Sequence, residues 1–163
     1  TPVVGDGLVI TAEALFVGCT GTGYAGYNGE HTLDGITYTT NQVMVAQGSS
    51  AVGVEGYLQT QKEKGLIANK NAYSKAIKTI TLSYWSTYDD PYMPTIKAGA
   101  TADALTAVTS SLGTGVGTGV TNSKGYEFKV YTITYTLPEG CYFWEYTNVT
   151  GGAQYFSQIV LGF

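Results

Sequence analysis

Arginine is absent from this 163-residue chain, and charge of either sign is scarce. All 8 basic residues are lysine, charged residues make up only 12% of the chain, and the formal net charge is −4. Duplex nucleic acid is bound through several phosphate contacts from arginine and lysine, so an acidic chain without arginine is a poor candidate for that role. We expect no nucleic-acid partner.

Long apolar runs and clustered metal ligands are also missing. No stretch approaches the ~20 apolar residues of a membrane helix, so we expect no membrane insertion. The 2 cysteines, Cys19 and Cys141, lie near opposite ends of the chain and lack the close spacing of zinc ligands. They either form one disulfide, worth up to ~4.7 kcal/mol for a loop of about 100 residues, or stay buried as free thiols.

Signatures of catalysis are weak. Residues 21–26 spell G-x-G-x-x-G, but turn-forming Tyr27-Asn28-Gly29 follows instead of the helix that a dinucleotide site requires. The single histidine, His31, lies in a glycine-rich loop, and no G-x-S-x-G motif accompanies it. The carboxylates considered for glycoside hydrolysis or calcium binding sit mostly at turns: Asp89, Asp90, Glu127, Glu139 and Glu145. We expect neither an enzyme nor a cofactor.

Short runs of β-branched and aromatic residues, separated by glycine-rich breaks, dominate what is present. The clearest is 78–87, where Ile80, Leu82 and Tyr84 alternate with threonine and serine. Such a period of two predicts a sheet packed on one side. The predicted strands are residues 8–17, 36–40, 43–46, 57–61, 66–68, 78–87, 95–98, 127–137, 141–146 and 154–161.

Many short strands with little helix predict an all-β fold, an antiparallel β-sandwich of jelly-roll type. We expect one domain over residues 1–163, with a first strand at 8–17, a glycine-rich loop at 18–35 and the main sandwich at 36–163. One or two helical turns are expected within 100–111, and a second glycine-rich loop at 113–125. Long loops often carry function, so these two loops are candidate contact surfaces.

Aromatic residues are the most suggestive feature, with 14 Tyr, 2 Trp and 5 Phe making up 13% of the chain. Trp85 is expected in the core, and Phe143 is expected to point inward. Flat rings beside amides and hydroxyls suit the apolar faces of sugars, and tyrosine and tryptophan are also enriched at protein interfaces. The candidate ligand-binding residues are Tyr24, Tyr88, Tyr92, Tyr142, Trp144 and Tyr146.

Four stretches resemble jelly-roll modules of secreted and surface proteins of gut-type bacteria and of virion proteins of their phages. These are ITYTTNQVMVAQG (36–48), GYLQTQKEKGLIANKNAYSKAIKTITLSYW (56–85), TIKAGATADAL (95–105) and YFWEYTNVTGGAQYFSQIVLGF (142–163). The resemblance lies in the order of strands and turns over residues 36–163, including the N-x-x-GGA turn before the last strand. It implies a non-catalytic surface role and no particular ligand.

Two functional hypotheses follow. The first is a non-catalytic, surface-exposed recognition module that binds a glycan, or a surface protein, through loop and strand aromatics. The second is a structural subunit of a virion or extracellular assembly, such as a decoration, fibre or capsid-associated protein, with self-association or contact to assembly neighbours. Both hypotheses place the protein outside the cell, on a cell surface or on a virion.

Overall fold

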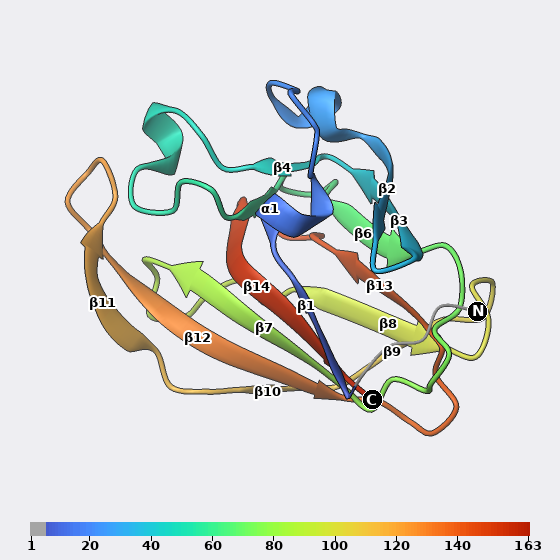
Figure 1. Cartoon of the computed structure of the whole chain (residues 1–163). Coiled ribbons are helices and arrows are strands. Elements are labelled where there is room, and N and C mark those ends of the chain that lie inside the picture. Colours follow the sequence, from blue (N-terminus) through green and yellow to red (C-terminus); the bar gives the residue numbers. More distant parts are fainter. Residues whose placement is uncertain (1–5) are drawn as a thin grey trace.

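A computed structural model describes residues 6–163 of the chain, which form two antiparallel sheets packed face to face (Figure 1). The larger sheet contains β1 (Gly7–Ile10), β4 (Val43–Val45), β5 (Leu58–Thr60), β7 (Thr79–Ser86), β10 (Ser110–Leu112), β11 (Val116–Thr121), β12 (Glu127–Thr136) and β14 (Gln154–Gly162). The smaller sheet contains β2 (Gly29–Leu33), β3 (Ile36–Asn41), β6 (Leu66–Asn69), β8 (Thr95–Gly99), β9 (Thr106–Ala107) and β13 (Phe143–Thr147). Three short helices complete the fold: α1 (Ala12–Leu15), η1 (Tyr24–Tyr27) and η2 (Ser49–Ala51).

The strand pairing confirms the predicted sandwich. Eight strands form nested antiparallel pairs. The outermost pair is β5 with β14, the next is β6 with β13, then β7 with β12, and the innermost is β8 with β9. The chain passes from one sheet to the other along this series, in the neighbour orders β12-β7-β14-β5 and β6-β13-β8-β9. This is the pairing of a long hairpin rolled into two sheets, which is the jelly roll.

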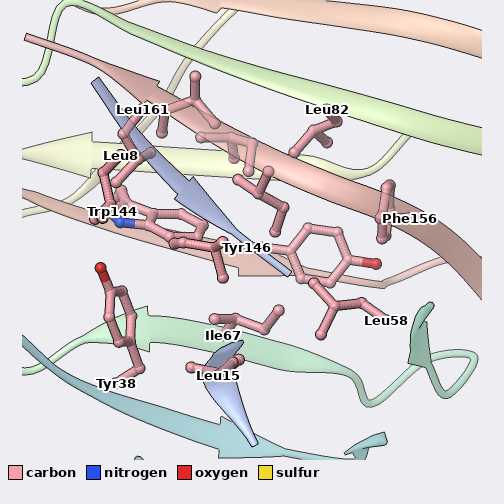
Figure 2. Close-up of a cluster of buried hydrophobic side chains, with 14 of the residues drawn as sticks. Leu8, Leu15, Tyr38, Leu58, Ile67, Leu82, Trp144, Tyr146, Phe156 and Leu161 are labelled. Atoms are coloured by element: carbon pink, nitrogen blue, oxygen red, sulfur yellow. The ribbon is translucent and has the colours of Figure 1, made fainter. Parts of the chain in front are cut away.

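The core lies between the two sheets and follows the alternation read from the sequence. In β7, Ile80, Leu82 and Tyr84 are buried, while the threonines and serine between them are half-exposed. Figure 2 shows Trp144 and Tyr146 of the smaller sheet turned toward the leucines and phenylalanine of the larger one. Burial of such large side chains contributes about 1.5–3 kcal/mol each, which makes this layer the main source of stability.

Five tyrosines of this core are at least 98% buried, hydroxyls included. We call them the buried phenols: Tyr38, Tyr73, Tyr84, Tyr135 and Tyr146. Buried hydroxyls need partners, and Tyr73 Oη lies 2.8 Å from Tyr38 Oη and 2.9 Å from the Nε1 of Trp144, which donates to it. Removal from water raises the pKa of each buried phenol above its ordinary value.

The N-terminal region departs from the prediction of one strand over 8–17. Strand β1 ends at Ile10, and helix α1 follows. Thr11 caps this helix, because its Oγ1 accepts a hydrogen bond from the Ala14 amide at 3.2 Å. The glycine-rich stretch 18–35 is likewise not all loop, since it contains η1 and β2. The apolar run 8–17 does not continue as a strand because Thr11 caps a helix within it, and part of 18–35 forms a strand because β2 pairs with β3 in a hairpin.

Two further expectations are wrong. The stretch 100–111 forms a turn and then β9 instead of helical turns, since backbone pairing of Lys97 with Ala107 is available at the sheet edge. Its threonines and valine also disfavour a helix. The glycine-rich stretch 113–125 contains β11, which pairs with β12. Both segments become strands because each can pair with an exposed strand edge, that of β8 or that of β12. The local sequence pattern does not reveal which edges are free to pair.

Candidate functional site

The predicted aromatic stripe on β13 is wrong as a binding surface. Trp144 and Tyr146 are fully buried, so no ligand reaches their rings without unfolding the sandwich. Tyr142, two residues earlier, is half-buried. Phe143 is half-exposed and belongs to the outer side of its sheet, opposite to the predicted inward orientation. The period of two was right and its direction was wrong, because sequence alone does not say which face of a strand meets the other sheet.

Tyr88 and Tyr92 are exposed at 59% and 47%, and both lie on the segment that joins β7 to β8. Their ring centroids are 5.9 Å apart and the rings stand edge to face. Gly152 packs against Tyr92, since a Cβ on this glycine would lie 3.1 Å from two ring carbons of the tyrosine. The structure therefore brings these two predicted residues together at the surface.

Side chains from β12 and β14, the two strands on either side of β7, hold this segment in place. The hydroxyl of Tyr131 on β12 donates to the Tyr88 carbonyl at 2.7 Å, and that of Tyr135 donates to the Pro94 carbonyl at 2.8 Å. From β14, the amide of Gln154 donates to the Tyr92 carbonyl at 2.9 Å. A segment anchored at three carbonyls loses little conformational entropy when a ligand binds.

The end of β7, the β11–β12 hairpin turn and η2 lie at the same end of the sandwich (Figure 1). Residues from all three line a surface cavity there. A cavity of about 230 Å³ is lined by the aromatic rings of Trp85, Phe128 and Tyr155 together with Ser50 and Ser86. A second cavity of about 220 Å³ adjoins it. Thr87, Tyr88 and Asn122 line both cavities, and Lys124 and Tyr126 line the second alone. We call the two together the aromatic cleft.

The floor of the aromatic cleft is a small apolar cluster on the outer face of the larger sheet. Trp85 packs there, with its ring 5.1 Å from Tyr57 and 6.2 Å from Phe128. It is half-buried, so the prediction that it belongs to the core between the sheets is wrong. Trp85 points outward because its neighbours on β7, Tyr84 and Ser86, take the two inward positions. Segment 46–57 and the β11–β12 hairpin cover its other sides.

Asn122 supplies the most directional polar group of the aromatic cleft. Its Oδ1 accepts the backbone amides of Lys124 and Tyr126 at 3.0 Å each, which fixes the hairpin turn. Its Nδ2 donates no hydrogen bond to any residue that the structure describes. Sequence reasoning missed Asn122 and Tyr126, although the run Asn122 to Gly125 has the composition of a tight turn and an exposed aromatic follows it.

Charge plays a small part in the aromatic cleft. Lys124, exposed at the tip of the hairpin, is the only charged residue among those that line the two cavities. Lys129 and Asp89 pair with each other nearby, beside a separate surface hollow lined by Gly113, Gly115 and Tyr131. The cleft therefore offers aromatic rings, hydroxyls and an amide to a ligand.

The remaining predicted residues lie elsewhere. Tyr24, on η1, is half-buried, and its hydroxyl accepts a hydrogen bond from Gln59 at 2.8 Å, away from the aromatic cleft. Of the two alternatives left open for the cysteines, the structure has the free thiols: Cys19 and Cys141 are not bonded to each other. Cys19 lies beside β2, 3.6 Å from His31, whereas Cys141 precedes β13. Three strand spacings, roughly 14 Å, separate these strands, beyond the reach of a disulfide.

Within residues 6–163, no helix is long and apolar enough to cross a membrane, and no three metal-binding side chains cluster together. Comparison of the chain with protein families, curated proteins and solved structures gives no match. A functional assignment therefore rests on the geometry of the aromatic cleft.

Proposed function

We propose that this protein is a non-catalytic, surface-exposed recognition module that binds a glycan in the aromatic cleft. The observation that carries the proposal is a pair of cavities that share Thr87, Tyr88 and Asn122 in their linings, with the exposed rings of Tyr88 and Tyr126 at the rim. Ligand sites are typically concave and largely apolar, with a few convergent polar groups that set orientation. This combination suits a sugar, which has apolar C–H faces and a periphery of hydroxyls.

In the proposed complex, sugar rings stack on Tyr88 and Tyr126 at the rim, while Trp85 and Tyr155 form the floor. The Nδ2 of Asn122 donates to a sugar hydroxyl. Since the contacts come mainly from neutral groups, affinity should change little between about 0.05 M and 0.5 M salt. A glycan ligand also accords with a position outside the cell, on a cell surface or on a virion.

The test is binding of the purified protein to a broad panel of polysaccharides and surface glycans, by microarray and then calorimetry. Tyr88→Ala and Tyr126→Ala should each weaken binding about tenfold or more, as removal of a central aromatic contact costs more than ~1 kcal/mol. Tyr142→Ala is the matched control, because Tyr142 is half-buried and lies outside the cleft. No binding across the panel, or equal losses in all three variants, would overturn the proposal.

A structural subunit of a virion or extracellular assembly is the second candidate, and one feature favours it. Leu112 and Val116, on the edge strands β10 and β11, are 43% and 61% exposed. Apolar side chains on a sheet edge invite pairing with a neighbouring chain. Light scattering after size exclusion tests it: an oligomer dissociated by Val116→Lys supports an assembly role, and a monomer with glycan affinity supports the first candidate.

A further inference from the structure

Cys19 and His31 form a contact that the glycan proposal does not use. His31 projects from β2, and its two ring nitrogens have different neighbours. Nε2 lies 2.8 Å from the Tyr27 carbonyl oxygen, and Nδ1 lies 3.6 Å from Cys19 Sγ. A carbonyl oxygen only accepts hydrogen bonds, so Nε2 must carry the proton and donate it. In the neutral ring Nδ1 is then bare, and the Cys19 thiol must be the donor.

The surrounding residues fix this orientation of the imidazole. The ring of Phe16 stands edge to face with it, at a centroid distance of 4.8 Å. The Tyr27 carbonyl also accepts the hydroxyl of Thr40 at 2.8 Å, which keeps the carbonyl aimed at the same place. His31 is therefore held with its unprotonated nitrogen toward the sulfur, as a base is held toward a nucleophile.

The loop that carries Cys19 back to β2 has a tightly packed turn. A Cβ on Gly21 would lie 2.3 Å from the Gly26 carbonyl oxygen, so the two glycines touch through their backbones. The Cys19 amide donates to the Phe16 carbonyl at 3.0 Å, which ties the start of the loop to the end of α1. These backbone contacts place the Cys19 sulfur beside the imidazole of His31.

The second cysteine provides an internal contrast. Cys19 and His31 are both partly exposed, although Cys19 also packs against the edge of the core. Cys141 is 96% buried, and burial raises the pKa of its thiol. The chain therefore holds one accessible thiol with a base beside it and one inaccessible thiol without one.

We propose that Cys19 is a nucleophilic thiol that exchanges with low-molecular-weight disulfides, with His31 as its base. The thiol proton passes to His31 Nδ1, and the thiolate attacks one sulfur of the disulfide. A new S–S bond joins Cys19 to that half, the old S–S bond breaks, and the other half leaves as a thiolate that takes the proton from the imidazolium. Cys19 is oxidised to a mixed disulfide and the reagent is reduced by the same two electrons.

The test uses 4,4′-dithiodipyridine, an uncharged disulfide whose released thiopyridone absorbs light, at about pH 7. In the Cys141→Ala protein, Cys19 should react about tenfold or more faster in the native state than after unfolding in guanidinium, with glutathione as the reference in each solution. A partly buried thiol without activation would react more slowly when folded. The Cys19→Ala protein, which retains only Cys141, should react about a hundredfold more slowly than the Cys141→Ala protein in the native state.

His31→Gln in the Cys141→Ala background isolates the base. The glutamine amide can still donate to the Tyr27 carbonyl but offers no imidazole to the sulfur, so the rate should fall about tenfold. An unchanged rate in this variant would overturn the role of His31. A native rate for Cys19 no higher than the unfolded rate would overturn the proposal as a whole, and this comparison needs no substitution at His31. Neither result depends on glycan binding.

Discussion

Tyr73 joins two other buried polar groups, and its hydroxyl therefore matters more to stability than that of its neighbour Tyr38. Trp144 donates to the Tyr73 oxygen, and Tyr38 shares a hydrogen bond with the same hydroxyl. Tyr73→Phe leaves both the indole N–H and the Tyr38 hydroxyl buried without a partner. Each orphaned group costs about 1–3 kcal/mol, so we expect a loss of about 2–6 kcal/mol. Tyr38→Phe removes one hydrogen bond and should cost about 1 kcal/mol.

The double variant sharpens the prediction. With both hydroxyls gone, only the N–H of Trp144 remains unpaired, so Tyr38→Phe together with Tyr73→Phe should cost less than the sum of the two single changes. Urea unfolding followed by tryptophan fluorescence measures all three free energies of unfolding. For a chain of this size, 1 kcal/mol corresponds to a shift in Tm of about 2–4 °C, so Tyr73→Phe should lower Tm by roughly 4–24 °C.

The ordering of the variants decides the outcome. A Tyr38→Phe protein as unstable as the Tyr73→Phe protein, or a Tyr73→Phe protein as stable as the original, would refute the hydrogen-bonded chain through Tyr73. Additive losses in the double variant would refute the shared hydroxyl. Each single change keeps the ring and its packing, so a cavity is not a competing cause.

Three other perturbations test the fold. As pH rises above about 10, tyrosines of the unfolded chain lose their protons while the buried phenols of the folded protein keep theirs. The free energy of unfolding is therefore constant below about pH 10 and falls above it by about 1.4 kcal/mol per pH unit and per phenol. Urea midpoints that stay constant to pH 11 would contradict this. Gly99→Ala puts a Cβ 2.2 Å from the Ala104 carbonyl oxygen and should cost about 1–3 kcal/mol, whereas Gly151→Ala, with open space around it, should be neutral in the same melts. Asn148→Ala removes the buried amide that donates to the Gly152 carbonyl at 2.9 Å and should lower Tm by about 3–10 °C in calorimetry.

Residue composition and alternation by themselves determined the class of this protein. β-branched and aromatic runs broken by glycine specify short strands, and the period of two in 78–87 fixes which side chains of β7 share a face. Of the loop tyrosines that the sequence offered for ligand binding, Tyr88 and Tyr92 are exposed, in a segment rich in turn residues, whereas Tyr24 is half-buried. Local signals sufficed for the strands and their alternation.

Only the tertiary structure decided which faces are covered. Trp85 and Trp144 both lie within runs of alternating residues, yet Trp85 forms the floor of a surface cleft and Trp144 fills the core. The difference arises because segment 46–57 and the β11–β12 hairpin fold over the outer face of the larger sheet. The distance between Cys19 and Cys141, and the contact between Cys19 and His31, likewise depend on strand order. Strand order is set by contacts between residues far apart in the chain, which no local pattern encodes.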